Sequence, residues 1–204
     1  MILILDYDMG NIASIKNMLH CIGYDDIVIS SDRADIDKAD KIILPGVGAF
    51  DKGMENLDKN NLIEPLIYAV NDQKKPILGI CLGMQLLGLD SEEGQRAGLG
   101  LIPFHTRRFR LDNEYKVPHM GWNEVTIDKD ACPLLRFVDE LSPRYYFVHS
   151  FHAVCDDSAN VLMTAEYGYR FTAAVVKDNV FGVQFHPEKS HTYGKAIMKG
   201  FANL

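Results

Sequence analysis

The feature that most constrains the fold is a short apolar segment that ends at a cysteine between two glycines. Residues 77–80 have the length of a buried strand, and residues 84–87 continue in an apolar helical pattern. Gly79 and Gly83 lie two positions before and after Cys81, as in a nucleophile elbow, where a tight strand-to-helix turn exposes the central side chain. The helix dipole at such a turn favours a nucleophilic thiolate. On its own, the segment also fits a small cysteine buried in an apolar strand.

The first half of the chain alternates short apolar strands with helical patterns. Strands are predicted at 1–5, 27–29, 41–44 and 77–80, and helices at 12–22 with Asn11 as N-cap, 33–39, 53–57 and 62–70. This alternation predicts a mainly parallel sheet that is covered by helices on both faces. The loops after Leu5, Leu44 and Ile80 should therefore meet at the carboxyl edge of the sheet, where ligands bind in such folds.

From about Leu99 the alternation gives way to short strands joined by tight turns. Strands are predicted at 107–111, 124–127, 145–150, 161–165, 173–177 and 180–185, and a closing helix at 193–203. That spacing is typical of antiparallel β structure. The predicted fold class is α/β: a single domain over residues 1–204, with a mainly parallel central sheet flanked by helices and an antiparallel C-terminal extension.

Composition and charge exclude several classes of function. The 204 residues, 47% hydrophobic and 24% charged and without a linker-like tract, suit one compact soluble domain. The net charge of −7 argues against a general nucleic-acid or anionic-membrane surface. Asp6 ends the first apolar run too early for a signal peptide or a membrane span. The four cysteines form no C-x-x-C pair, which favours reduced thiols and a cytoplasmic location.

A histidine and a glutamate follow the last predicted strand, in the segment Phe185-His186-Pro187-Glu188. In extended chain, residues two apart point to the same side, so His186 and Glu188 can face the same edge of the sheet. A carboxylate beside an imidazole can fix its tautomer and stabilise its protonated form. Alone, the pair could be an ordinary surface contact. Together with Cys81, it predicts a Cys-His-Glu catalytic triad.

A glycine-containing loop, Pro45-Gly46-Val47-Gly48, follows the strand at 41–44. Glycines let a backbone N–H turn toward a neighbouring site, as in an oxyanion hole. The loop lacks the full patterns of phosphate-binding loops. The alternative is a loop with only a structural role. Because the loop is expected to lie beside Cys81, the oxyanion-hole interpretation is favoured.

These three motifs together resemble the class I (triad) glutamine amidotransferases, over essentially the whole chain. Within that family, three further stretches are similar to HisH, the glutaminase subunit of imidazole glycerol phosphate synthase: residues 118–123, 146–150 and 186–190. The resemblance implies a flavodoxin-like fold and a reaction in which Cys81 attacks the side-chain amide of glutamine. His186, oriented by Glu188, would protonate the departing ammonia and then activate water against the thioester.

The resemblance also assigns the other site residues. The oxyanion would be held by the backbone N–H groups of Leu82 and Val47, and in relatives this loop can need to flip before the hole is complete. Positions that hold glutamine in the family correspond to Gly48, Gln85, His149, Ser150 and Phe151. No cofactor is implied.

HisH-like proteins dock on a (βα)8-barrel cyclase, HisF, and pass ammonia through it, so the resemblance implies a heterodimer. Residues matching that interface are Asn11, Met120, Trp122 and Lys189. A tryptophan is a common interface anchor, although a buried core position is equally common. His119, His149 and His152 could suggest a metal, but strand alternation would send His149 and His152 to opposite faces and no further ligand completes a site.

Several positions depart from the HisH pattern, among them Asp8, Phe104, Phe151 and His191. Other stretches, such as Tyr167–Thr172, look closer to HisH paralogues that supply ammonia for converting an acetamido sugar to an acetamidino sugar in surface-polysaccharide synthesis. Three hypotheses therefore remain: the histidine-pathway glutaminase, the sugar-amidating paralogue, and a non-catalytic regulatory domain that keeps the fold.

Overall fold

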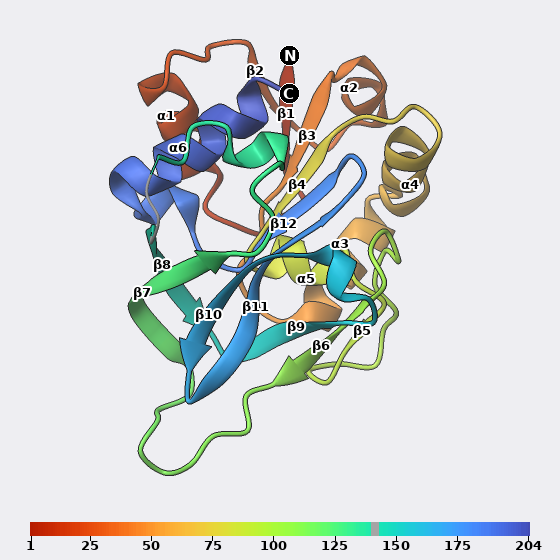
Figure 1. The fold of residues 1–204 in the computed structure, drawn as a ribbon. Helices are drawn as coiled ribbons and strands as arrows, with labels where there is room; N and C mark the ends of the chain where they lie inside the picture. The colour runs from red at the N-terminus through yellow and green to blue at the C-terminus, as the bar shows by residue number, and fades with distance from the viewer. Residues whose placement is uncertain (140–142) are drawn as a thin grey trace.

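A mixed sheet runs through the whole molecule in the computed structural model, which describes residues 1–139 and 143–204 (Figure 1). Nine of its strands follow one another in the order β2-β1-β3-β4-β12-β11-β10-β7-β8, and the other three, β5, β6 and β9, branch from β11. The strands are β1 (Ile2–Leu5), β2 (Ile27–Ser30), β3 (Lys41–Leu44), β4 (Ile77–Ile80), β5 (Asp90–Ser91), β6 (Phe104–Arg108), β7 (His119–Ile127), β8 (Arg144–His149), β9 (Phe151–Cys155), β10 (Val161–Tyr167), β11 (Tyr169–Lys177) and β12 (Val180–Val183). The predicted α/β class is confirmed.

Helices cover both faces of the parallel half of the sheet (Figure 1). They are α1 (Ile12–Cys21), α2 (Arg33–Lys38), α3 (Phe50–Lys59), α4 (Ile63–Asn71), α5 (Leu82–Leu86) and α6 (His191–Ala202), with short 3-10 turns η1 (Pro133–Leu135), η2 (Ser158–Asn160) and η3 (Pro187–Lys189). Strand alternation divides the core between the two faces. In β1, Ile2 and Ile4 pack with α1 and α6, whereas Leu3 and Leu5 pack with α3 and α4.

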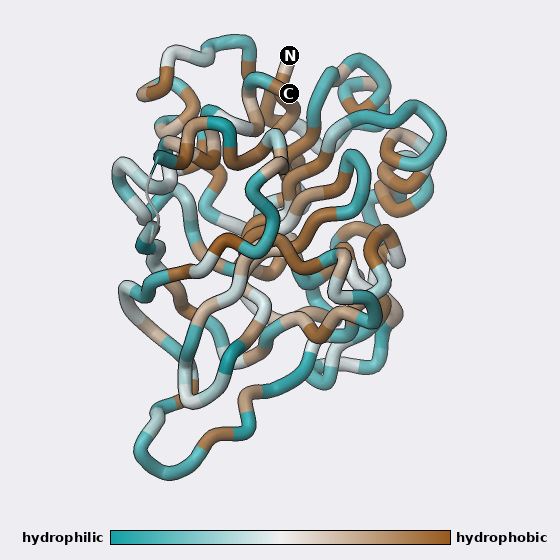
Figure 2. Tube along the Cα trace, viewed as in Figure 1, coloured by the Kyte–Doolittle hydropathy of each residue, from teal (hydrophilic) through white to brown (hydrophobic). Residues whose placement is uncertain are grey.

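Three of the four strands predicted in the first half, β1, β3 and β4, form the buried centre of the molecule (Figure 2), whereas β2 lies at the edge of the sheet and is partly exposed. Every residue of β1 and β4 is buried, because a parallel strand covered on both sides has no solvent face. Each fully buried Leu or Ile contributes about 1.5–3 kcal/mol to folding relative to an exposed position. These strands therefore provide a rigid support for the loops at their carboxyl ends.

One detail of the predicted first helix is wrong. Asn11 does occupy the N-cap position of α1, but its side chain makes no capping hydrogen bond, and Ile22 already lies beyond the helix as its C-cap. Asn11 has φ −95° and ψ 63°, which differs from the extended backbone of a usual N-cap.

The second half is antiparallel as predicted, with corrected boundaries. The strand expected at 107–111 is β6, which ends at Arg108, and the strand expected at 145–150 ends at His149 because the chain bends at Ser150 and returns as β9. The short strand β5 and the strand β9 were not predicted. Neither has a clear alternating pattern in sequence, because their neighbours in space come from distant segments.

The last strand joins the two halves of the sheet. β12 ends at Val183, two residues before the predicted end, and pairs parallel with β4 and antiparallel with β11. Its register sets Val183 opposite Ile80, so the carboxyl ends of β4 and β12 lie side by side. The residues that follow these two strands are therefore held next to each other although they are far apart in sequence.

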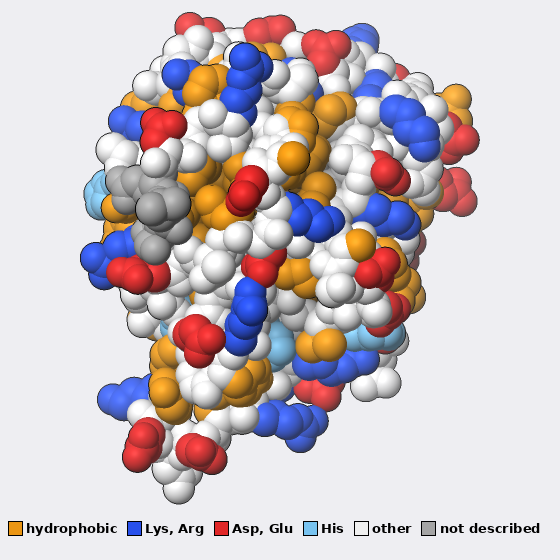
Figure 3. Space-filling view, viewed as in Figure 1, with side chains coloured by type: hydrophobic (Ala, Val, Ile, Leu, Met, Phe, Trp, Pro, Cys, Tyr) orange, Lys and Arg blue, Asp and Glu red, His pale blue; other side chains and the backbone are white. Residues whose placement is uncertain are grey.

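The surface carries charges of both signs. On the face seen in Figure 3, acidic and basic side chains alternate and no large single-sign patch forms. No helix among residues 1–139 and 143–204 is long and apolar enough to cross a membrane.

Candidate active site

Cys81 lies at a sharp turn between β4 and α5. Its backbone has φ +55° and ψ −112°, a conformation that residues other than glycine rarely adopt. The turn is possible because a Cβ on Gly83 would lie 1.9 Å from the carbonyl oxygen of Leu44, and one on Gly79 would lie 2.6 Å from the oxygen of Gly83. The Cys81 N–H donates to the Val183 carbonyl at 2.8 Å. Strain of this kind, maintained by tight packing, is typical of functional sites.

His186 and Glu188 form a buried pair at the end of β12. The Nδ1 atom of His186 lies 2.8 Å from Oε1 of Glu188, and each side chain is only 2% exposed. The prediction that these residues meet is confirmed, but the extended backbone given as the reason is wrong. Pro187–Lys189 forms the 3-10 turn η3, and this turn brings the carboxylate back to the ring. Ser190 Oγ holds the turn by donating to the His186 carbonyl at 2.6 Å.

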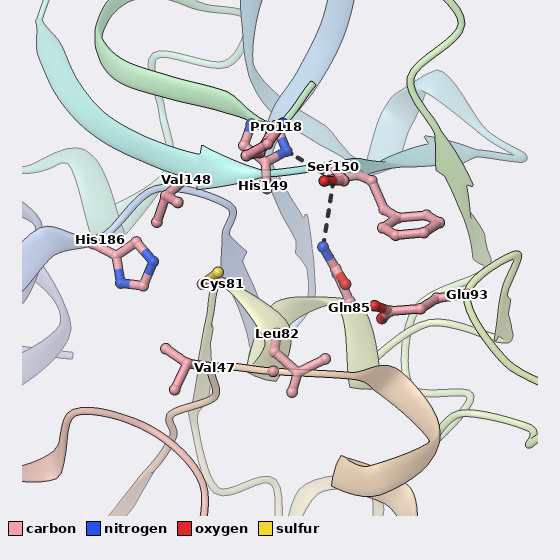
Figure 4. A pocket seen from close by; sticks show the side chains of 12 residues that line it. Val47, Cys81, Leu82, Gln85, Glu93, Pro118, Val148, His149, Ser150 and His186 are labelled. Carbon is pink, nitrogen blue, oxygen red and sulfur yellow. Dashed lines mark hydrogen bonds between the residues drawn. The ribbon is translucent and has the colours of Figure 1, made fainter. Parts of the chain in front are cut away.

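The electrostatics of this pair favour a protonated imidazole. Burial alone would lower the pKa of His186, but interactions with the Cys81 sulfur and the Glu188 carboxylate outweigh it and raise the pKa to about 9. The Nε2 atom has no hydrogen-bond partner among the described residues, and the ring faces the Cys81 sulfur across the cavity (Figure 4). This atom is therefore free to exchange a proton with a bound molecule.

The glycine loop after β3 packs directly on the elbow. A Cβ on Gly46 would lie 2.6 Å from the backbone nitrogen of Gly83, so only glycine fits there. The Gly46 carbonyl accepts a hydrogen bond of 3.3 Å from the N–H of Leu82. In this conformation the backbone N–H of Leu82, next to Cys81, already has an acceptor. Gly48 has φ +113°, a conformation that again favours glycine.

Tyr7 holds the glycine loop at residues 45–48 in place through a hydrogen bond. Its side chain is completely buried, and its hydroxyl donates to the carbonyl of Pro45. Burial, together with the nearby Cys81, raises the pKa of the Tyr7 hydroxyl far above its ordinary value, so the group stays a neutral donor. Asn56 Nδ2 in turn donates to the Tyr7 carbonyl at 3.0 Å. The loops after β1, β3 and β4 thus meet at one edge, as predicted.

These elements surround a cavity of about 320 Å³ (Figure 4). Its lining includes every predicted oxyanion and glutamine-binding residue, together with Cys81 and His186; Glu188 lies behind His186. The lining residues are Val47, Gly48, Cys81, Leu82, Gln85, Glu93, Pro118, Val148, His149, Ser150, Phe151 and His186. A cavity of this size suits a small polar molecule rather than a polymer.

Two glutamines connect the far wall of the cavity to the nucleophile. Gln85 Nε2 donates to Gln184 Oε1 at 3.0 Å and lies 3.4 Å from the Phe151 carbonyl, and Gln184 Nε2 lies 3.7 Å from the Cys81 sulfur. Gln184 is fully buried and was not singled out from the sequence. Its position two residues before His186 and just after a strand could have indicated its place at this edge.

Glu93 is a second functional candidate that sequence reasoning missed. It lines the cavity, and its Oε2 accepts a hydrogen bond of 2.8 Å from the N–H of Phe50 at the start of α3. Asp51 secures the same segment by accepting from the N–H groups of Gln95 and Arg96. A carboxylate in this position can bind an ammonium group. The loop sequence has no periodicity, so only the structure could place it.

The predicted separation of His149 and His152 is wrong. The two residues belong to different strands, β8 and β9, because the chain bends at Ser150. Both rings pack on Phe109, with ring centroids 5.1 Å and 4.8 Å from it. Within residues 1–139 and 143–204, no group of three or more His, Cys, Asp or Glu side chains could hold a metal ion.

The predicted interface residues lie outside the cavity. Met120 and Trp122 are 61% and 41% exposed on β7, which removes the alternative of a buried core tryptophan. The Trp122 ring stacks on His191 at 5.5 Å, and Lys189 Nζ lies 5.7 Å from the centre of the Tyr146 ring. These side chains form one partly apolar patch beside η3. Asn11, at the start of α1, is partly exposed.

Comparison with known proteins gives consistent matches over the full chain. The family model described as "Glutamine amidotransferase class-I" matches residues 3–203. The imidazole glycerol phosphate synthase subunit HisH 2 of Methanococcus maripaludis is 52% identical, with 98% of each chain covered. The subunit of the same name from Pseudomonas aeruginosa is 50% identical over the whole of both chains.

Solved structures share the fold at much lower identity. A structure described as a glutamine amidotransferase superposes with a TM-score of 0.76 at 15% identity, covering 98% of this chain and 97% of that one. PurLQS from Thermotoga maritima gives a TM-score of 0.73 at 22% identity, covering 99% and 97%. These two likenesses concern the fold alone.

Proposed function

Because this chain belongs to the class-I glutamine amidotransferase family, we propose that it hydrolyses glutamine and supplies the ammonia to imidazole glycerol phosphate synthesis in histidine biosynthesis. The observation that carries the proposal is the meeting of Cys81, at a strained elbow, with the buried His186–Glu188 pair across one cavity. The full-length identity to HisH subunits supports the pathway. A non-catalytic domain would have no need to maintain this strain.

The reaction proceeds through a thioester. The Cys81 sulfur attacks the side-chain amide carbon of glutamine, and the resulting tetrahedral intermediate collapses as His186 gives its proton to the leaving nitrogen, releasing ammonia. His186 then takes a proton from water, which attacks the thioester carbon. Glutamate leaves and Cys81 recovers its thiolate while His186 is again protonated. Glu188 keeps Nδ1 protonated and orients the ring throughout.

The oxyanion hole is formed by the backbone N–H groups of Leu82 and Val47. Leu82 donates to the Gly46 carbonyl in the present conformation, so the Gly46–Val47 peptide has to rotate before both donors face the substrate. Losing one such donor costs about 10²–10³ in kcat in other hydrolases. The isolated chain is therefore expected to have low basal activity. Val47 is exposed and can be reached by a partner.

Glutamine is held by the opposite walls of the cavity. Gln85, the His149–Phe151 segment and Gly48 hold the substrate, as inferred from the family resemblance and supported by their common place in the lining. Glu93 binds the α-ammonium group, since it is the acidic residue at the mouth and its orientation is fixed by the Phe50 N–H. Glutamine and glutamate both carry the α-ammonium group, so the contacts to the uncharged side-chain amide distinguish glutamine from glutamate.

The partner is a HisF-type (βα)8-barrel cyclase that receives ammonia directly. It docks on the patch formed by Met120, Trp122 and Lys189, together with Asn11. The support is the exposure of two large apolar side chains on one strand, stiffened by stacking on His191. The resulting complex is a heterodimer.

The decisive experiment measures glutamate release by the purified chain, alone and with a HisF-type barrel, in the presence and absence of its phosphoribulosyl-formimino substrate. Strong stimulation by barrel and substrate together is the expected result. If the chain hydrolyses glutamine at a rate that neither the barrel nor its substrate changes, the proposed triad stands. The ammonia acceptor should then be sought among amidated sugars. No glutamate release under any condition would contradict the glutaminase proposal.

A further inference from the structure

Three polar side chains form a chain beside the cavity: His119 and His149, which are buried, and Asn123, which is partly exposed. Nδ1 of His119 lies 3.0 Å from Nε2 of His149, and Nδ1 of His149 lies 2.7 Å from the carbonyl oxygen of Phe151. At the other end, Nδ2 of Asn123 lies 3.4 Å from Nε2 of His119. The chain thus runs from β7 to the Ser150–Phe151 bend that lines the cavity.

The direction of each hydrogen bond follows from the one before it. A carbonyl oxygen only accepts, so His149 must carry its proton on Nδ1. Burial lowers the pKa of His149 to about 3 and that of His119 to about 4, so both rings are neutral and each has one donor and one acceptor nitrogen. Nε2 of His149 is then an acceptor, and His119 must donate to it from Nδ1.

Asn123 sets the other end of the chain. Its Oδ1 accepts from the N–H of Glu124 at 2.9 Å and its Nδ2 donates to the carbonyl of Glu166 at 2.8 Å, which fixes the orientation of the amide. Nδ2 is therefore the atom that faces His119, and it can only donate. All three bonds point the same way, from Asn123 toward Phe151.

Packing holds the central ring in place. His119 is stacked between Phe147, with centroids 5.0 Å apart, and Tyr167, at 4.1 Å, with interplanar angles of 27° and 28°. His119 and His149 are also direct cross-strand neighbours in the β7–β8 ladder. The opposite face of β7 presents Met120 and Trp122 to solvent. One strand thus carries the start of the chain on its inner side and the proposed partner patch on its outer side.

We propose that His119 and Asn123 are positioning residues for glutamine: with His149 they form a one-way hydrogen-bond chain that fixes the Phe151 carbonyl and thereby the bend that contacts the substrate. This inference rests on the proposed glutaminase function. The same carbonyl is approached by Gln85 Nε2, so the chain and the Gln85–Gln184 pair fix one peptide from two sides. Misplacing this peptide should weaken binding of glutamine more than its chemistry.

The kinetic test compares two substitutions of His119. His119→Phe keeps a stacking ring but leaves Nε2 of His149 without a donor, and we expect KM for glutamine to rise about three- to tenfold with kcat changed less than twofold. His119→Asn restores a donor near the Nδ1 position, so it should recover most of the loss. Tyr169→Phe is the matched control. It removes the hydroxyl paired with His152 at 2.9 Å, in the same aromatic cluster but outside the chain, and should leave KM unchanged.

The structural test is the ¹⁵N NMR spectrum of histidine-labelled protein without substrate. Both His119 and His149, assigned by the loss of signals in His119→Phe and in a His149→Phe variant, should be neutral with the proton on Nδ1, the less common tautomer of free histidine. Protons on Nε2, or charged rings at pH 7, would overturn the chain itself. The tautomers are measured on wild-type protein, and the variants serve only to assign the signals.

The outcomes separate this inference from the function on which it rests. Wild-type protein that releases no glutamate even with the barrel and its substrate would overturn the proposed function and with it the role in glutamine binding, whatever the tautomers. If wild type is active and both histidines have the expected tautomers, but His119→Phe has an unchanged KM for glutamine, only the positioning role is overturned. An equal rise of KM in Tyr169→Phe would also overturn it, by assigning the effect to loss of packing in the cluster.

Discussion

The N–H of Leu82 donates to the carbonyl oxygen of Gly46 across a distance of 3.3 Å. This contact fills one of the two donor positions that a tetrahedral oxyanion would need. The same loop is fixed through Tyr7, whose hydroxyl donates to the carbonyl of Pro45. In the proposed mechanism, this structure is therefore a resting conformation in which Cys81 and His186 are in place and the oxyanion hole is closed.

Removing the Tyr7 hydroxyl should loosen this closed state. In Tyr7→Phe the Pro45 carbonyl loses its buried donor, and one such hydrogen bond contributes about 1 kcal/mol. We expect basal glutaminase activity to rise about three- to tenfold and the stimulation by the barrel partner to fall by a similar factor. Tyr68→Phe, at an exposed position on α4, is the control. Lower basal activity with unchanged stimulation would mean that Tyr7 supports the open state instead.

Cys81 can be tested against a second cysteine of the same chain. Cys81→Ser should reduce glutamate release by roughly 10³-fold or more, because nucleophile and base act as a unit. Cys21→Ser changes an exposed thiol on α1 and should leave the rate unaltered. Both variants should unfold at similar denaturant concentrations. Turnover retained in Cys81→Ser would contradict the thioester mechanism.

The His186–Glu188 pair makes stability depend on pH in a defined direction. The Cys81 sulfur and the Glu188 carboxylate together raise the pKa of His186 to about 9, above the ordinary value of 6.5, so the stability from these interactions is complete below pH 6.5 and lost as pH rises through 9. Because Glu188→Gln removes only the contribution of the carboxylate, we expect the free energy of unfolding to decrease over this range by on the order of 1 kcal/mol more in wild type than in Glu188→Gln. Urea titrations from pH 6 to 10 measure this difference. Parallel curves for the two proteins would refute it.

Glu93 should affect binding of glutamine rather than its hydrolysis. Glu93→Gln keeps the size of the side chain but removes the charge that faces the α-ammonium group, and we expect KM to rise roughly tenfold or more with little change in kcat. Glu92→Gln, at the neighbouring position that contacts Arg108 and Arg110, is the matched control. A fall in kcat at unchanged KM would assign Glu93 to the chemical step.

Trp122 should matter for assembly and little for folding. It is 41% exposed, and exposed substitutions usually change stability by less than about 0.5 kcal/mol. Trp122→Ala should therefore unfold like wild type, yet weaken barrel binding roughly tenfold or more in a titration. Tyr68→Ala removes another exposed ring and serves as control. A large loss of stability in Trp122→Ala would instead make this residue part of the fold.

Much of the fold and the centre of the site could be predicted because they depend on local pattern. Residues 42–44 and 77–80 are short apolar runs, and Gly79 and Gly83 indicate the turn at Cys81 before any contact is known. The elements that escaped prediction depend on distant partners. β9 owes its existence to pairing with β6 and β11, and Glu93 is oriented by the start of α3.

The His186–Glu188 pair shows how a correct prediction can have an incorrect reason. Alternation in an extended strand predicted that the two side chains share a side, and they do meet. The chain, however, turns at Pro187 into a 3-10 helix, which sequence pattern does not distinguish from the end of a strand. His149 and His152 show the opposite outcome, because an undetected bend at Ser150 invalidated the alternation argument.

The place of β12 between β4 and β11 has a consequence for the order of folding. Cys81 is synthesised about a hundred residues before His186, and only the insertion of β12 beside β4 brings the two together. Domains tend to fold from the N-terminus during translation, and pairings between distant segments form slowly. A nascent chain on the ribosome would thus have the thiol of Cys81 without the imidazole of His186 until residues 180–188 emerge. In the proposed mechanism, the chain can therefore release no ammonia before β12 has joined the sheet.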